Sequence, residues 1–304
     1  MDLYLPIANL SVNALVIILL GGGVGLLSGM FGVGGGFLTT PLLIVYGIPP
    51  TVAAASAASQ VTGASVSGVF AHFRRGGVDT KMGGVLVAGG VIGAFFGAWL
   101  FRLLQASGQI DTVIAIVYVL MLGSIGGLMA RESLGTIGLQ RRGLPPRAKK
   151  RRHHPLVAAL PLRTRFYASG LYISPLAPLL LGFGTGILTM LLGIGGGFIL
   201  VPAMIYLLGM ATSVVVGTSL FQTLFVTAVA TMVHATTTKA VDIVLAALLL
   251  LGSVIGAQVG ARLATKVKPE YLRLALAVIV LLVGLRILLG LVWRPEEIFS
   301  VTLS

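Results

Sequence analysis

Cysteine is absent from this chain of 304 residues, and acidic side chains are scarce, with eight Asp and Glu in all. Without cysteine, the chain can form no disulfide, no thiolate metal site and no cysteine nucleophile. The acidic residues fall near the ends of apolar runs or between them, and none lies in the middle of one. A carboxylate-based proton relay requires such a residue, so its absence disfavours a cation pump and favours a route for anions.

Charged residues of either sign make up only 10% of the chain, against about 25% in soluble domains. Hydrophobic residues account for 57%, and apolar stretches of membrane-spanning length recur along most of the sequence. The composition therefore predicts an all-α polytopic membrane protein. No Lys or Arg precedes the first apolar run, so we expect that run to be a retained helix and not a cleaved signal peptide.

A glycine-rich element occurs twice and organises the rest of the sequence. Residues 32–37 read GVGGGF and residues 193–198 read GIGGGF, each followed four positions later by a proline. Further matching pairs continue at an offset of 162 or 163 residues: Ser56 with Thr218, Gln60 with Gln222, His72 with His234, and Asp79 with Asp242. The chain is therefore an internal duplication.

Each half contains about five apolar segments, and the glycine element joins the first two. The segments are 13–30, 37–46, 52–73, 82–103 and 112–129 in the first half, and 174–192, 198–208, 213–234, 240–263 and 271–293 in the second. The second segment of each half is too short for an apolar core about 30 Å thick at a rise of about 1.5 Å per residue. We therefore predict helical hairpins with glycine tips inside the membrane.

The two predicted membrane repeats, residues 1–130 and 169–304, are separated by a basic linker at 131–168 that holds 10 of the 21 Lys and Arg. A basic run beside membrane helices is typical of a cytoplasmic loop, so we interpret the net charge of +13 as contact with anionic lipid headgroups and not as nucleic-acid binding. This orientation places 17 basic residues inside and four outside, with both termini outside. Each half then makes an odd number of crossings, which predicts two inverted repeats, the architecture of many secondary transporters.

The glycine elements are candidate anion sites, because a helix that starts there leaves N–H groups unpaired at its positive end. The alternative is that the glycines only permit tight packing. The candidate substrate-binding residues are Gly34, Gly35, Gly36, Phe37 and Thr39 in the first half, and Gly195, Gly196, Gly197 and Phe198 in the second.

A polar cluster follows each glycine element. Ser56 lies one helical turn before Gln60, and Thr218 lies one turn before Gln222, so each pair shares a helix face. Uncharged donors of this kind can replace the hydration of an anion without a competing negative charge. We add these four residues to the candidate site, together with the neighbouring hydroxyls of Ser59 and Ser219. The alternative is that they form hydrogen bonds between helices.

Two other repeated features have structural interpretations. Glycines recur at every fourth position at 89, 93 and 97 and again at 252, 256 and 260, which predicts close helix packing. His72 and His234 are expected at corresponding helix ends. A role in proton coupling is conceivable for them, but we favour solvation at the membrane interface.

The duplicated G-x-G-G-G-F-x3-P element, at residues 32–41 and 193–202, resembles the sulfite exporter family known as TauE/SafE, bacterial permeases of sulfur-containing anions. The resemblance covers nearly the whole chain outside the basic linker. It implies a secondary transporter in the bacterial cytoplasmic (inner) membrane that moves sulfite, sulfoacetate or related organosulfonates, usually outward. The linker is longer than expected for the family and could add a regulatory or lipid contact.

Other functions stay open. A channel-like anion pore has the same composition, as does a carrier for another small organic anion. A membrane-embedded enzyme is weakly supported, because the sequence offers no nucleophile–base pair, metal-ligand cluster or pair of buried carboxylates. We therefore expect no catalytic residue, no metal and no cofactor, and a small anionic substrate as the partner, with the oligomeric state undefined.

Overall fold

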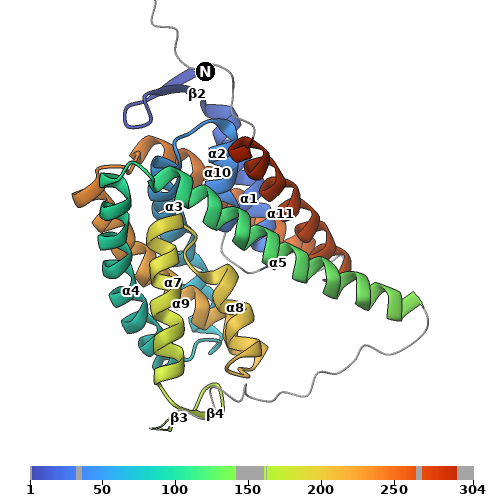
Figure 1. Ribbon diagram of the computed structural model, residues 1–304. Helices are drawn as coiled ribbons and strands as arrows, with labels where there is room; N and C mark the ends of the chain where they lie inside the picture. The colour runs from blue at the N-terminus through green and yellow to red at the C-terminus, as the bar shows by residue number, and fades with distance from the viewer. Residues whose placement is uncertain (1, 32–35, 142–160, 162, 265–268, 293–304) are drawn as a thin grey trace, which may run out of the picture.

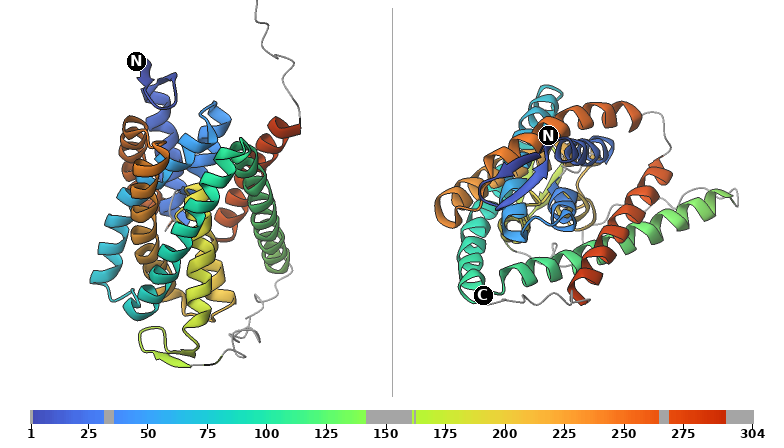
Figure 2. Two further views of the ribbon diagram at one scale, coloured as in Figure 1. Left: turned by 60° about the vertical axis from the view of Figure 1, so that its left-hand side comes forward. Right: turned by 90° about the horizontal axis from the view of Figure 1, so that it is seen from above.

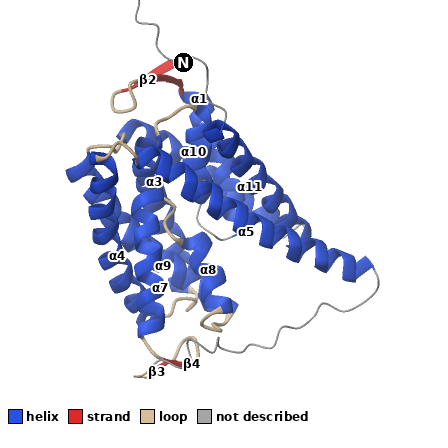
Figure 3. Ribbon diagram, viewed as in Figure 1, coloured by secondary structure: helices blue, strands red, loops and turns tan. Residues whose placement is uncertain are grey.

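The computed structural model describes residues 2–31, 36–141, 161, 163–264 and 269–292 (Figure 1). These residues are mainly helical, and the strands among them form two small antiparallel hairpins (Figure 3). The first half contains β1 Asp2–Leu5, β2 Leu10–Asn13, α1 Ala14–Phe31, α2 Gly36–Tyr46, α3 Pro50–Arg74, α4 Thr80–Ala106 and α5 Ile110–Arg141. The second half contains β3 Thr164–Phe166, β4 Leu171–Ile173, α7 Leu176–Leu192, α8 Gly197–Tyr206, α9 Thr212–Val233, the π-helical turn η1 His234–Thr238, α10 Ile243–Ala264 and α11 Pro269–Val292.

The lengths of these helices confirm the prediction of an all-α polytopic membrane protein. Five helical segments are long and apolar enough to cross a membrane: Thr80–Ala106, Ile110–Gly138, Val214–Thr238, Ile243–Gly260 and Arg273–Val292. The second helix of each half is short, as predicted, with 11 residues in α2 and 10 in α8. Large apolar side chains such as Trp99, Leu120 and Leu282 are more than half exposed, as expected for a surface that faces lipid.

Two features of the observed elements differ from the prediction. Helix α5 continues to Arg141, well past the predicted end at residue 129, so the start of the basic linker is helical. The hairpins β1–β2 and β3–β4 were not predicted, because strands of three or four residues carry almost no periodic signal.

The helices of the two halves are interleaved. Helix α1 packs along α10, and α4 packs along α7. Helix α3 packs along α9, and α5 packs against α11, which it crosses at one side of the molecule (Figure 2). Each pair takes one helix from each half. In the duplication, α1 corresponds to α7, α4 to α10, α3 to α9 and α5 to α11. The pair α1–α10 is therefore equivalent to the pair α7–α4, and each of the other two pairs joins a helix to its own counterpart.

The glycine stripes bring these pairs together, which confirms their structural interpretation. A Cβ atom built on Gly93 of α4 would lie 2.1 Å from the carbonyl oxygen of Phe183 on α7. In the equivalent pair, a Cβ on Gly256 of α10 would lie 2.0 Å from the oxygen of Gly22 on α1. The helix backbones are in direct contact at these positions, which only glycine allows.

The two β-hairpins lie at opposite ends of the molecule (Figure 1). Hairpin β1–β2 leads into α1 at one end, and hairpin β3–β4 leads into α7 at the other. In β1–β2 the register pairs Leu3 with Val12, and in β3–β4 it pairs Arg165 with Tyr172. Equivalent parts of the two halves therefore occupy opposite ends.

Candidate functional site

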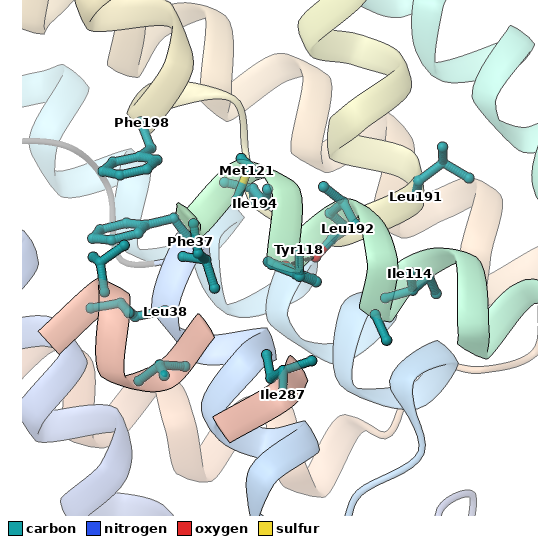
Figure 4. Close-up of a cluster of buried hydrophobic side chains, with 14 of the residues drawn as sticks. Phe37, Leu38, Ile114, Tyr118, Met121, Leu191, Leu192, Ile194, Phe198 and Ile287 are labelled. Atoms are coloured by element: carbon teal, nitrogen blue, oxygen red, sulfur yellow. Dashed lines mark hydrogen bonds between the residues drawn. The ribbon is translucent and has the colours of Figure 1, made fainter. Parts of the chain in front are cut away.

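The described end of the first glycine element, Gly36 and Phe37, meets the second glycine element inside the molecule. The ring of Phe37 stacks on that of Phe198, with centroids 4.1 Å apart and planes 2° from parallel (Figure 4). A Cβ atom on Gly36 would lie 2.8 Å from the oxygen of Ile194 in the other element. Residues 194–198 are all buried. The predicted site residues Gly34 and Gly35 lie outside the described residues.

The second glycine element has a backbone that requires glycine. Gly193, Gly195 and Gly196 have φ angles of 70°, 73° and 73°, in the left-handed region. Gly193 ends α7, where its N–H donates to the oxygen of Thr189 at 2.8 Å, and Gly196 is the N-cap of α8. The chain therefore reverses between α7 and α8 within four residues.

The start of α8 is an electropositive end of a helix inside the protein. Its first amides with acceptors among the described residues are those of Ile199 and Leu200, which both donate to the oxygen of Gly196. The N–H groups of Gly197 and Phe198 precede them, where a helix leaves its donors unpaired. This end of the helix favours a negatively charged group.

The second glycine element is held by hydroxyl groups from other helices. Thr40 on α2 donates to the carbonyl oxygen of Leu192, at the end of α7. Tyr118 on α5 donates to the same oxygen (Figure 4). Thr223 on α9 donates to the oxygen of Gly195. The candidate site that was predicted from the sequence does not include these three residues. Their contacts join segments far apart in the chain and leave no local signal.

Gln60 and Gln222 are buried, and each has one side-chain amide atom without a hydrogen-bond partner among the described residues. The Oε1 of Gln60 accepts from the hydroxyl of Thr39 at 3.0 Å, but its Nε2 has no partner among the described residues. The Nε2 of Gln222 donates to Thr185 Oγ1 at 3.4 Å, and its Oε1 has no partner there. Buried amide groups are normally satisfied, so an unpartnered atom on both members of a repeated pair makes the two glutamines candidates for contact with a ligand.

The amide of Gln222 faces the second glycine element. A Cβ atom on Gly196 would lie 3.6 Å from Gln222 Oε1. A Cβ on Gly195 would lie 2.8 Å from the methyl group of Thr223, which follows Gln222 on α9. The structure therefore brings Gln222, Gly195 and Gly196 together next to the start of α8.

The predicted hydroxyl groups all have protein partners, whereas each glutamine keeps one amide atom without a partner among the described residues. Ser56 accepts from the N–H of Asp242 at 3.1 Å, and Thr218 accepts from the N–H of Asp79 at 2.9 Å. Ser59 and Ser219 donate to carbonyl oxygens of their own helices at 3.3 and 2.9 Å. These bonds fit the alternative that the hydroxyls hold helices together. Of the polar cluster, the glutamines are the best candidates for binding a substrate.

Asp79 and Asp242 form two equivalent junctions that link the halves. At the Asp79 junction, Oδ1 accepts from the N–H of Met82 and caps α4, and Oδ2 accepts from the N–H of Ser169 between β3 and β4, both at 3.0 Å. At the Asp242 junction, Oδ1 caps α10 and Oδ2 accepts from the N–H of Ile7 between β1 and β2 at 3.3 Å. Each aspartate thus ties a helix start to the hairpin of the other half.

The two histidines have different surroundings, which corrects one interpretation. His72 is half-buried at the end of α3, but His234 is fully buried at the start of η1. The Nε2 of His234 lies 2.9 Å from the oxygen of Met190, and its Nδ1 lies 3.1 Å from Thr238 Oγ1. Solvation at the interface is therefore wrong for His234, because its ring nitrogens are occupied by protein groups.

The apolar spans, together with the helix pairs α1–α2 and α7–α8 that the glycine elements join, define a multi-pass membrane protein. Residues 17–287 match the family described as "Sulfite exporter TauE/SafE". The chain belongs to this family and is a membrane transporter.

Curated relatives carry names of the same kind. The "Probable membrane transporter protein YjnA" of Bacillus subtilis is 31% identical over 275 residues, which cover 90% of this chain and 98% of the relative. A "Probable membrane transporter protein" of Xylella fastidiosa (strain Temecula1) is 29% identical over 69% of this chain and 70% of its own length. The "Probable membrane transporter protein YunE" of B. subtilis is 24% identical over 90% of this chain and 96% of the relative. No solved structure matches this chain.

Proposed function

We propose that the protein is a secondary transporter that exports small sulfur-containing anions, such as sulfite or organosulfonates, across the bacterial cytoplasmic membrane. The observation that carries this proposal is the pair of buried glutamines on α3 and α9, each with one amide atom that has no partner among the described residues. The family description, a sulfite exporter, supports the sulfur-containing substrate and the outward direction.

The substrate binds near the middle of the membrane, between the helix pairs α1–α2 and α7–α8 that the glycine elements join. The starts of α2 and α8 offer helix-end N–H groups, and Gln60 and Gln222 offer amide groups from α3 and α9. The helix-end N–H groups and Nε2 of Gln60 are uncharged donors, which suit an anion because they hold it without a full countercharge and so allow fast release. The stacked rings of Phe37 and Phe198 support this placement, since they bring the two helix starts together.

The two halves are inverted relative to each other in the membrane. The position of the β-hairpins at opposite ends supports this arrangement, as do the reciprocal helix pairs (Figure 1). Inverted repeats with a central site are common in secondary transporters. The linker at 131–168 faces the cytoplasm and anionic lipid headgroups, and both termini lie outside, which the distribution of Lys and Arg supports.

Transport assays in proteoliposomes test the function. We expect saturable flux of sulfite or sulfoacetate, with sulfate and thiosulfate as comparison anions. If none of these four anions shows saturable flux, the proposal is refuted. Conductance far above carrier turnover would favour the channel-like pore in its place.

The glutamines provide the site-specific test. Gln60→Ala and Gln222→Ala should each raise the half-saturation concentration by roughly tenfold to a hundredfold, because the first removes the donor Nε2 and the second removes the acceptor Oε1 that we expect to contact the substrate. Gln105→Ala is the matched control, since Gln105 is exposed on α4, and it should transport normally. A Gln60 or Gln222 variant that is folded and has unchanged affinity would show that the residue only holds helices together.

A further inference from the structure

We infer that Gln222 presents its Oε1 to the substrate as a hydrogen-bond acceptor, so that the site prefers anions that carry a hydrogen-bond donor of their own. Such anions include hydrogensulfite and hydroxy- or amino-substituted sulfonates. The inference rests on the proposed function, and it names the class of substrate more narrowly.

Thr185 on α7 sets the orientation of the Gln222 amide. A threonine hydroxyl has one hydrogen to donate. That of Thr185 faces two carbonyl oxygens of its own helix, those of Gly182 at 2.9 Å and Leu181 at 3.0 Å. Its Oγ1 therefore accepts from Gln222, and only Nε2 of the amide can donate. If the amide were rotated to place Oε1 at this position, the Thr185 hydroxyl would have to give up its bond of 2.9 Å to the oxygen of Gly182 and donate to Gln222 over 3.4 Å, which is less favourable.

The donors near Gln222 Oε1 are already used. The hydroxyl of Thr189 donates to the oxygen of Thr185 at 2.7 Å. That of Thr223 donates to Gly195, and that of Thr227 donates to Thr223 at 2.8 Å. No side-chain hydroxyl in this group is left to satisfy the oxygen, so a bound molecule with an O–H or N–H group can supply its donor.

A substrate with both an anionic oxygen and a donor fits this environment. Its anionic oxygens match the N–H groups at the start of α8, and its O–H or N–H matches Gln222 Oε1 beside Gly196. An anion with acceptors alone would leave the buried oxygen unpaired. A site built for a substrate hydroxyl discriminates strongly against the analogue that lacks it.

The experiment compares two sulfonates of nearly equal shape, 2-hydroxyethanesulfonate and propane-1-sulfonate, in which a methyl group replaces the hydroxyl. Binding to the purified full-length protein is measured by titration calorimetry. We expect the hydroxysulfonate to bind about tenfold more tightly or better. In Gln222→Met, which keeps the side-chain length but removes the amide, the preference should be lost. Gln60→Met is the matched control and should weaken both ligands while keeping their ratio.

A second variant tests the orientation directly. Thr185→Val removes the acceptor for Nε2 with little change in shape, so the amide can rotate and the preference should fall. If the wild type binds both sulfonates equally, the inference is overturned while the transport proposal stands. A preference that survives in Gln222→Met or Thr185→Val also overturns it. If neither sulfonate nor sulfite binds the wild type, the proposed function fails and the inference fails with it.

Discussion

The contact between α1 and α10 predicts that a single methyl group at Gly256 will destabilise the protein. The Cβ atom of Gly256→Ala would lie 2.0 Å from the carbonyl oxygen of Gly22, whereas folded proteins essentially never place a Cβ within 3.0 Å of another heavy atom. The helices must therefore separate by about 1 Å, and a backbone oxygen cannot rotate away as a side chain can. Overpacking of this kind costs about 1–3 kcal/mol.

A second glycine in a helix allows this cost to be measured by itself. Gly123 is exposed on α5, and a Cβ atom there meets nothing within 4 Å. Replacing a helical glycine by alanine stabilises the helix by about 0.5–1 kcal/mol, and both variants share this gain. The difference in stability between Gly256→Ala and Gly123→Ala therefore reports the overpacking cost alone.

Thermal unfolding of the purified variants in detergent, followed by size-exclusion chromatography with fluorescence detection, measures this difference. We expect a midpoint several degrees lower for Gly256→Ala than for wild type, and an equal or higher midpoint for Gly123→Ala. Gly93→Ala should resemble Gly256→Ala, since its Cβ would lie 2.1 Å from the oxygen of Phe183. Equal midpoints for Gly256→Ala and Gly123→Ala would refute the direct contact of the helix backbones.

Three further predictions follow from the hairpins and the glycine element. Asp242→Asn should weaken the Asp242 junction, because an amide NH₂ cannot accept a hydrogen bond, and should lower the free energy of unfolding by about 1–3 kcal/mol. Hydrogen exchange in hairpin β1–β2 should become faster, and unchanged protection there would contradict this prediction. In this cysteine-free chain, Tyr4→Cys and Tyr167→Cys, both at exposed positions on opposite hairpins, should react with impermeant reagents from opposite sides of the membrane. Labelling of both from one side would exclude inverted halves. Gly196→Ala should abolish transport, because its φ of 73° disfavours a side chain beside the site. The control Gly108→Ala should retain transport, because Gly108 has a similar φ of 69° but a Cβ atom there meets nothing within 4 Å. Normal transport by both variants would exclude a role for the Gly196 turn.

Local sequence patterns were sufficient to predict most of the helices and their close packing. The length of each apolar run decides whether it can cross a bilayer, which is why the short α2 and α8 were predictable. The spacing of four between Gly89, Gly93 and Gly97 puts them on one helix face, where the missing side chains allow a neighbouring helix backbone to approach closely. The end of α5 was misjudged because polarity was taken as the end of the helix, but helical hydrogen bonds continue through polar residues to Arg141.

The candidate site was predictable in outline, because duplication marked Gln60, Gln222 and the two glycine elements. Their contacts were decided by the tertiary structure. Spacing along a helix puts Ser56 on the same face as Gln60, but it cannot reveal that Ser56 accepts from the N–H of Asp242, 186 residues away. The same holds for Gln222, whose orientation depends on Thr185 of another helix. Helix length and face depend on neighbours in the chain, whereas hydrogen-bond satisfaction depends on which helices are brought together, and the interleaving of the two halves decides that.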